Sequence, residues 1–304
     1  VPASLLGSVM NRIPTVVSLD ATSHQLDTLA GSYNHQVHPQ PIEALKHRVH
    51  QTTFQRAASL ITWSQWAADS LVSDYGVRRD RVEVIPPGVV MSQWRTCERR
   101  SAPADVTKIL FVGGDFDRKG GTLLVNAVAR LNEDPEVRDR GHRLELHLVT
   151  SADVDAGPHV YVHQGLTPNM PELVELFHQA DIFALPTQGD CSPVVRAEAA
   201  AAGLPAVTTD VGGISESVVD GVTGHLVEPT VESLAEGLRP LVLELEYRQN
   251  LARAATDHAA RAMDAEANAR RVLDLHISHS RPQENEGRVS LTVSGEIASD
   301  LEAE

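Results

Sequence analysis

Two acidic side chains separated by seven residues mark the part of the sequence best suited to chemistry. Asp190 follows an apolar segment of strand length, Asp181–Leu185, and Glu198 lies further along in an alanine-rich segment. A carboxylate accepts hydrogen bonds from hydroxyl groups and repels phosphate groups, because both are negatively charged. We therefore expect the two carboxylates to flank one bound ligand and to hold its hydroxyl groups.

A helix start lies between these two carboxylates. Ser192 suits the N-cap position, and Pro193 suits the first helical position, where a backbone N–H is not needed. The N–H groups of Val194 and Val195 are then left free, and the helix end carries about half a positive charge. Such an end favours a phosphate group.

Apolar segments of strand length alternate with helical patterns along most of the chain. This alternation predicts an α/β fold with parallel sheets and helices on both faces. The expected strands are Thr15–Leu19, Leu60–Thr62, Arg81–Ile85, Ile109–Val112, Leu144–Thr150, Val160–His163, Asp181–Leu185, Ala206–Thr208 and His225–Val227. The expected helices are Ile42–Ala58, Gln65–Tyr75, Gly121–Leu131, Met170–Gln179, Pro193–Ala202, Ile214–Val219 and Val231–Leu243.

The chain divides into two α/β units. Thr96–Thr107 is polar and charged and contains Pro103, so we interpret it as a linker. We expect residues 1–95 to form a partial first unit and residues 105–240 to form a complete, doubly wound second unit. Val1 opens an apparently helical stretch, which suggests that upstream sequence is missing.

Two further segments follow the second unit. Residues 247–275 have a long helical pattern, and we expect this segment to cross back onto the first unit. Residues 276–304 are polar and acidic, a composition that predicts a largely disordered tail.

The composition excludes some classes of protein. The chain has 304 residues and a formal net charge of −15, and a nucleic-acid binder would be basic instead. No apolar run approaches the roughly 18 residues that span a bilayer, and no signal peptide opens the chain. Cys97 and Cys191 are far apart, so we expect reduced thiols and a cytoplasmic protein.

A series of motifs in a fixed order resembles glycosyltransferase family 4. The acid pair with seven residues between Asp190 and Glu198 is followed by an alanine-rich helix. The other matching segments are Ile85–Val89, Ile109–Gly114, Lys119–Gly121, Gly203–Pro205, Gly212–Glu216 and Asp220–Val227. The resemblance covers roughly residues 57–275, and it implies a GT-B fold made of two Rossmann-like units, the N-terminal one incomplete.

The resemblance implies roles for particular residues. Glu198 should hold the ribose hydroxyls of a nucleotide, and Asp190 should hold hydroxyls of the donor sugar. Lys119 should contact the diphosphate. Backbone groups near Leu166–Met170 should receive the base.

The first loop and the helix start complete the predicted site. The resemblance implies that Gly113 and Gly114 belong to a phosphate loop and that the start of the helix, at Ser192, Val194 and Val195, faces the diphosphate. Glu216, in the Gly-Gly-x-x-Glu segment, is a further candidate for contact with the donor.

The sequence departs from the family pattern at four places. The first acid is Asp190 where Glu is usual. Gly114 stands where an Arg usually follows the first glycine, and Arg118 is a candidate substitute. Val90 replaces an Asp, and Asp20 stands where a His is often found, which makes Asp20 a candidate catalytic or acceptor-side residue.

Simpler explanations exist for each of these residues. Glu198 and Lys119 could be solvated surface residues, and Asp190 could stabilise the turn before Ser192. Gly113 and Gly114 could serve turn geometry alone. Glu216 could be an acidic residue at a helix start, stabilised by the positive end of the helix dipole. Asp20 could cap the next segment.

The histidines and Cys191 carry less weight. His47 and His50 are three apart on an expected helix, as are His35 and His38 in a loop, but no cysteine or paired carboxylate completes a metal site. We expect no metal and no other cofactor. Cys191 adjoins the acid pair without a base to activate it, so we interpret it as a small buried thiol.

The leading hypothesis is a retaining glycosyltransferase that moves a hexose from a nucleoside-diphosphate sugar to a hydroxyl acceptor. The acceptor could be a glycan, a lipid or a small molecule, and a peripheral membrane contact stays among the expected interactions. The alternative is a truncated or non-catalytic module that binds the nucleotide sugar. A Rossmann-type dehydrogenase is disfavoured, because no Gly-x-Gly-x-x-Gly follows a strand.

Overall fold

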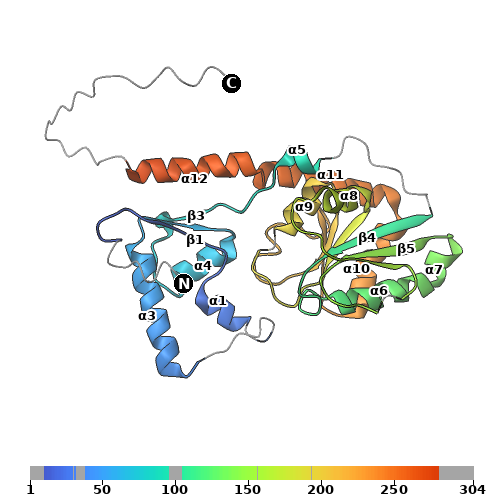
Figure 1. Cartoon of the computed structure of the whole chain (residues 1–304), viewed down its shortest axis with the longest axis horizontal. Coiled ribbons are helices and arrows are strands. Elements are labelled where there is room, and N and C mark those ends of the chain that lie inside the picture. The colour runs from blue at the N-terminus through green and yellow to red at the C-terminus, as the bar shows by residue number, and fades with distance from the viewer. Residues whose placement is uncertain are drawn as a thin grey trace, which may run out of the picture.

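The structure is a computed structural model that describes residues 10–29, 31, 38–95, 105–155, 157–192 and 194–280. Two α/β units lie side by side, and a long helical segment runs along one side of both (Figure 1). The α/β class expected from the alternating pattern is therefore confirmed.

The first unit contains a three-stranded parallel sheet with strand order β1-β2-β3. Its strands are β1 (Val16–Leu19), β2 (Ser59–Thr62) and β3 (Val82–Val84), close to the predicted bounds. Its helical elements are α1 (Ser23–Thr28), α3 (Gln40–Arg56), α4 (Gln65–Ser73) and the short turn η2 (Arg79–Arg81). The helix α5 (Met91–Trp94) then leads toward the second unit.

The second unit contains a six-stranded parallel sheet with strand order β6-β5-β4-β7-β8-β9. Its strands are β4 (Val106–Val112), β5 (Arg143–Val149), β6 (Val160–His163), β7 (Ile182–Leu185), β8 (Ala206–Thr209) and β9 (Gly224–Val227). The chain winds outward from β4 in one direction and from β7 in the other. Ligands of doubly wound sheets bind at the carboxyl ends of the strands beside this change of direction.

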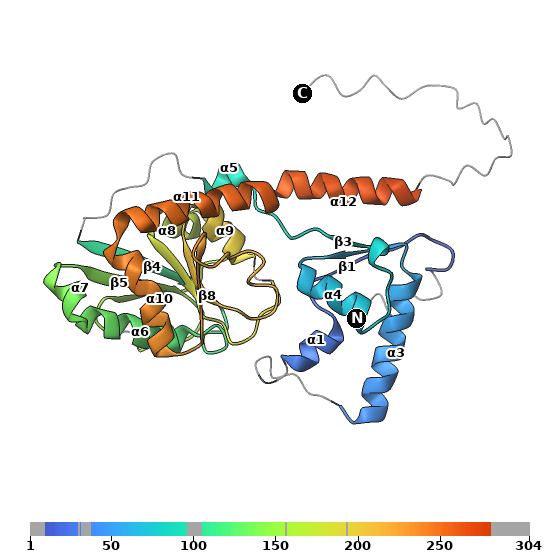
Figure 2. The ribbon, with the colours of Figure 1, turned by 180° about the vertical axis from the view of Figure 1, so that it is seen from behind.

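Helices cover both faces of the second sheet (Figure 2). They are α6 (Gly121–Glu133), α7 (Pro135–Asp139), α8 (Pro171–Gln179), α9 (Val195–Ala201) and α10 (Val231–Leu243). All four residues of β7 and of β8 are buried, as expected for strands covered on both sides. Leu124, Val128 and Leu131 recur at helical spacing on the buried face of α6.

The predicted segment 247–275 lies within two helices, α11 (Leu245–Ala262) and α12 (Ala265–Ser280). Between them Asp264 forms a β-bridge with Val89, which turns the chain toward the first unit. The side chain of Asn268 donates to the carbonyl oxygen of Pro86 at 3.0 Å, and Arg271 donates to that of Val84 at 2.8 Å. Figures 1 and 2 both show α12 lying along the first unit.

Three predicted boundaries differ from the structure. Helix α12 continues to Ser280, so residues 276–280 are helical, and the rest of the predicted tail lies outside the described residues. The predicted linker also falls largely outside them, but its last two residues already belong to β4. Ile214–Val219 forms turns and no helix, and Gly213, just before this segment, packs closely against Ser64 of the first unit.

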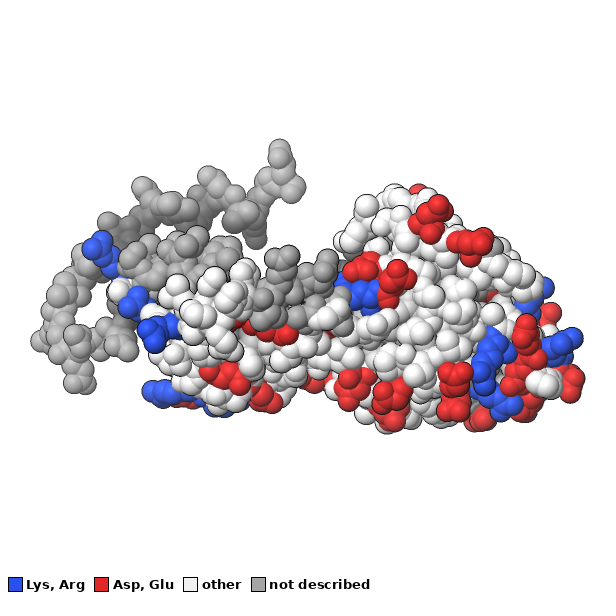
Figure 3. Space-filling model, turned by 90° about the horizontal axis from the view of Figure 1, so that it is seen from below, with Lys and Arg blue, Asp and Glu red and all other residues white. Residues whose placement is uncertain are grey.

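The surface agrees with the acidic composition. Asp and Glu side chains lie along both units in the view from below, and Lys and Arg side chains are concentrated near the two ends (Figure 3). No described helix is long and apolar enough to cross a bilayer.

Candidate functional site

A cavity of about 480 Å³ opens at the carboxyl ends of β4, β5 and β6, where the winding of the sheet changes direction. Six of the predicted site residues contribute to its wall: Gly113, Gly114, Leu166, Val194, Val195 and Glu198. The remaining wall residues are Val112, Val149, Thr150, Ser151, His163, Gly165, Thr167, Pro168 and Leu173. The structure therefore brings together segments that are far apart in the sequence, and we call this space the donor cavity.

The glycine-rich loop after β4 forms one side of the donor cavity. Gly113 continues the strand pairing, since its N–H donates to the carbonyl oxygen of Val149 at 2.9 Å. A Cβ at Gly113 would lie 3.0 Å from Cγ of Lys119, so the small residue lets the lysine stem pass. Gly120 is the N-cap residue of α6 with φ +79°, and a Cβ there would collide with the carbonyl oxygen of Pro186.

Lys119 and Asp190 form an ion pair across this close approach of two loops. Both side chains are largely buried, and Asp190 is only 7% exposed. The other carboxylate oxygen of Asp190 accepts a hydrogen bond from the N–H of Cys191 at 3.0 Å. The predicted diphosphate contact and the predicted sugar contact are thus held against each other, and neither side chain belongs to the wall of the donor cavity.

Arg118 has a different position from the one expected for a substitute phosphate ligand. Its guanidinium donates to the carboxylate of Asp115 at 2.9 Å and to the carbonyl oxygen of Gly189 at 2.5 Å. It does not line the donor cavity. Arg118 instead connects the glycine-rich loop with the loop that carries Asp190.

Glu198 lies on α9 with its side chain half-buried in the wall of the donor cavity. Burial raises the pKa of this carboxyl to about 7. No hydrogen bond or ion pair joins its carboxylate to the residues that the structure describes. A buried carboxylate in this situation is stabilised by any ligand that donates hydrogen bonds to it.

The helix start at Ser192 differs from the prediction. The N-cap residue is Val194, which has helical dihedral angles and no side-chain cap, and α9 begins at Val195. Ser192 lines another, smaller cavity of about 70 Å³ between the two units. The chain is already turning at Val194, so a side chain two residues earlier does not reach the first helical N–H groups.

Glu216 joins the two units and does not line the donor cavity. Its carboxylate accepts hydrogen bonds from the N–H groups of Gln65 at 2.5 Å and Trp66 at 2.7 Å, in the first turn of α4. A Cβ at Gly213 would lie 2.7 Å from Cβ of Ser64, so the glycine permits this contact. The predicted donor contact of Glu216 is therefore replaced by capping of a helix in the first unit.

Asp20 is exposed at the carboxyl end of β1 and lines neither of these two cavities. It does not cap the next helix either, because Thr22 is the N-cap of α1 and forms a capping box with Gln25. Cys191 is buried, as expected. No group of three or more side chains suited to a metal occurs in the described part of the chain.

Two functional candidates were missed by the sequence analysis. His163 ends β6 and lines the donor cavity. Arg196 is 4% exposed, lines the cavity between the units, and donates to the carbonyl oxygen of Ile214 at 2.8 Å. Burial lowers the pKa of Arg196 to about 10. Two features of the sequence could have indicated them. His163 is a polar residue at the end of a strand, and Arg196 is an arginine within an apolar helical turn.

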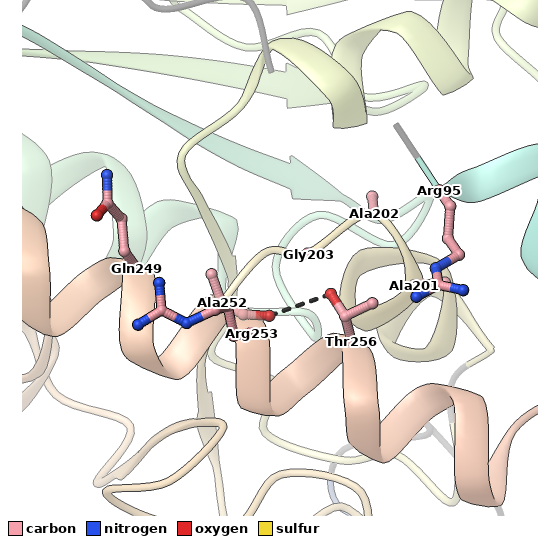
Figure 4. A pocket seen from close by; sticks show the side chains of 8 residues that line it. All are labelled: Arg95, Ala201, Ala202, Gly203, Gln249, Ala252, Arg253 and Thr256. Atoms are coloured by element: carbon pink, nitrogen blue, oxygen red, sulfur yellow. Dashed lines mark hydrogen bonds between the residues drawn. The ribbon is translucent and has the colours of Figure 1, made fainter. Parts of the chain in front are cut away.

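A further cavity of about 300 Å³ lies at the C-terminal end of α9, against α11 (Figure 4). Arg95 and the α11 residues Gln249, Arg253 and Thr256 contribute side chains to it. The hydroxyl of Thr256 donates to the carbonyl oxygen of Ala252 at 3.1 Å, which satisfies it within the helix. None of the predicted site residues lies here.

The sequence is similar to known families and to curated proteins. Residues 93–258 match the family model "Glycosyl transferases group 1", and residues 2–93 match "Glycosyltransferase Family 4". The D-inositol 3-phosphate glycosyltransferase of Paenarthrobacter aurescens is 31% identical over 67% of this chain and 53% of its own length. The enzyme of the same name from Nocardia farcinica is 31% identical over 64% of this chain and 47% of its own length.

Solved structures show the same fold. Sucrose-phosphate synthase from Thermosynechococcus elongatus superposes with a TM-score of 0.69 at 18% identity, over 90% of this chain and 71% of its own. Anabaena HepE in complex with UDP and glucose gives a TM-score of 0.69 at 17% identity, over 90% of this chain and 74% of its own. The GT-B fold implied by the resemblance is confirmed.

The chain spans about half the length of the curated relatives it matches. The family model nevertheless covers more than half of this chain and includes the whole donor cavity. The chain belongs to the group 1 glycosyl transferases, with an N-terminal part that matches glycosyltransferase family 4.

Proposed function

We propose that this protein is a retaining glycosyltransferase that transfers a hexose from a nucleoside-diphosphate sugar to a hydroxyl acceptor. The observation that carries the proposal is the donor cavity, whose wall contains Gly113, Gly114 and a half-buried Glu198 that has no partner among the residues the structure describes. The Lys119–Asp190 pair adjoins this loop. HepE, which has the same fold, was solved with UDP-glucose.

The arrangement suits the parts of such a donor. The carboxylate of Glu198 would accept hydrogen bonds from the ribose hydroxyls, and the backbone near Leu166 would receive the base. The ammonium of Lys119 would contact the diphosphate and stabilise its charge as the bond to the sugar breaks. Asp190 would then exchange its contact with Lys119 for hydroxyls of the sugar. We expect no metal ion, since the protein supplies this cation.

The acceptor is expected to approach from the first unit, since the carboxyl ends of β1, β2 and β3 point to the junction between the units. Relatives are named for D-inositol 3-phosphate, which makes a phosphorylated polyol the first acceptor to test. We place the reaction in the cytoplasm, where nucleotide sugars are used.

A non-catalytic nucleotide-sugar-binding module is the second candidate. The ion pair between Lys119 and Asp190 favours it, because this pair occupies both groups that the reaction needs. Binding alone could proceed through Glu198 and the loop backbone, without opening of the pair.

Calorimetry with UDP-, GDP- and ADP-sugars tests the binding proposal on this chain. We expect one of them to bind and Glu198→Gln to weaken it. Turnover is then measured with D-inositol 3-phosphate, on this chain and on a form extended at its N-terminus. Binding without turnover in either form would favour the non-catalytic module, and no binding to any donor would refute both candidates.

A further inference from the structure

His163 is a polar residue in the wall of the donor cavity that the proposed function does not yet use. It is the last residue of β6, pairs in register with Val149, and is half-buried. The cavity wall continues from His163 to Gly165 and Leu166, the segment proposed to receive the base. The imidazole therefore borders the part of the cavity expected to hold the base.

A second histidine fixes the orientation of this ring. Nε2 of His163 lies 3.1 Å from Nδ1 of His147 on the neighbouring strand β5. The two rings are within 14° of parallel, and Tyr161 stacks on His147 at 5.0 Å between centroids. Nε2 of His147 is buried without a hydrogen-bond partner among the described residues, and a carboxylate oxygen of Glu145 lies 3.9 Å away.

Burial favours the neutral form of both imidazoles. Burial lowers the pKa of His147 to about 4, and the neighbouring His163 contributes to this shift. Burial also lowers the pKa of His163. A neutral imidazole carries one N–H and one lone pair, so each ring has a single donor and a single acceptor.

Electrostatics then select the position of each proton. The charges near His147 are those of Lys108 and Glu145. The Glu145 carboxylate is the one that lies 3.9 Å from Nε2, so an N–H at this atom faces it favourably, whereas a lone pair there would be repelled. With that proton placed, Nδ1 of His147 must accept the hydrogen bond and Nε2 of His163 must donate it. Nδ1 of His163 is left with a lone pair, and it has no hydrogen-bond partner among the residues the structure describes.

We propose that His163 is a specificity-determining residue that accepts a hydrogen bond from an N–H group of the nucleotide base through its Nδ1. His147 and Glu145 are positioning residues, because they act only through the tautomer of His163. The diphosphate of a nucleotide sugar is excluded as the partner, since each of its phosphates is a diester without a proton to donate to a neutral acceptor. The inference rests on the proposed function and deepens it at the base.

The test compares a nucleoside diphosphate with inorganic pyrophosphate, which lacks the base. Calorimetry first identifies the best ligand among UDP, GDP and ADP. In His163→Leu its affinity should fall about tenfold, the scale of one lost hydrogen bond whose partner is left unsatisfied. Pyrophosphate affinity should change less than twofold. His163→Asn should retain most of the affinity, because its amide oxygen can replace the Nδ1 acceptor.

Two controls make the result specific. Gln164→Leu alters the exposed neighbour of His163 and should leave all affinities unchanged. Nitrogen NMR of the histidines reads the tautomer, which should be Nε2–H at His163 in the wild type. Glu145→Gln should reduce this preference and weaken the nucleoside diphosphate severalfold.

Three outcomes would overturn the inference in distinguishable ways. A wild type that binds a nucleoside diphosphate while His163→Leu binds it equally well refutes only the role of His163. A proton on Nδ1 of His163 in the NMR spectrum does the same. If the wild type binds none of the three nucleotides, the proposed function fails, and this inference fails with it.

Discussion

Asp190 and Glu198 lie on one short segment, yet their surroundings are opposite. The charge of Asp190 is compensated within the protein, by Lys119 and by the N–H of Cys191. Glu198 has no such partner within the described part of the chain, and its burial raises its pKa to about 7. The comparison teaches that the two carboxylates are prepared differently. Asp190 lies outside the wall of the donor cavity and its charge is already compensated, whereas Glu198 lies in that wall and is stabilised by a ligand that donates hydrogen bonds to it.

The largest expected effect is at the ion pair between Lys119 and Asp190. Lys119→Met leaves the buried Asp190 carboxylate without its cation, and breaking a buried pair in this way costs about 3 kcal/mol. Urea unfolding should show this loss, and calorimetry should show weaker diphosphate binding. The double variant Lys119→Met/Asp190→Asn should recover most of the stability but not the binding. Equal unfolding midpoints for wild type and Lys119→Met would show that the pair is not coupled.

Substitution of Glu198 should have a different effect in the same assays. Glu198→Gln removes the charged acceptor of the ribose hydroxyls, and we expect nucleoside-diphosphate affinity to weaken by about 1.5–3 kcal/mol. Stability above pH 7 should not fall, because the variant also removes a buried, unpartnered charge. A matched control is Glu175→Gln on α8, which lies outside the cavity wall. Unchanged affinity in Glu198→Gln would contradict the ribose assignment.

Because the pKa of Glu198 is raised, both the stability of the protein and its nucleotide affinity should depend on pH. The folded protein holds this proton up to about pH 7, whereas an unfolded glutamate releases it near its ordinary pKa of 4.5. The unfolded state therefore binds fewer protons in between, and the contribution of Glu198 to stability falls as pH rises from about 4.5 to 7. Nucleotide affinity should rise from pH 6.5 to 8.5, as the carboxylate ionises, and Glu198→Gln should show neither trend.

His163 also titrates, but burial lowers its pKa below the ordinary 6.5. The affinity measurement above pH 6.5 therefore isolates Glu198 from His163. An affinity that stays level across that range in the wild type would show that ionisation of Glu198 is not required.

Sequence reasoning reached the parts of this site that are set by local order along the chain. A strand followed by Gly113 and Gly114, and a helix carrying Glu198, must meet at the carboxyl edge of a parallel sheet. It did not reach contacts decided by packing between units. The roles of Glu216 and Arg196 depend on how α4 approaches the turns after β8, which no local pattern specifies. The break at Asp264 likewise depends on its bridge to Val89.

The smallest expected effect concerns Glu216, a third acidic residue that lies outside the donor cavity. It serves as a reference for the comparison of Asp190 with Glu198. Its carboxylate caps α4, so Glu216→Ala should cost about 1 kcal/mol of stability, the usual value of a lost helix cap. Glu216→Gln should retain part of this, because an amide oxygen can still accept one N–H. Neither variant should change nucleoside-diphosphate affinity by more than about twofold, since the donor cavity excludes this side chain. Calorimetry and urea unfolding on the same samples separate the two readouts. A tenfold loss of nucleotide affinity in Glu216→Ala, with stability unchanged, would return Glu216 to the donor site and show that the two units rearrange when the nucleotide binds.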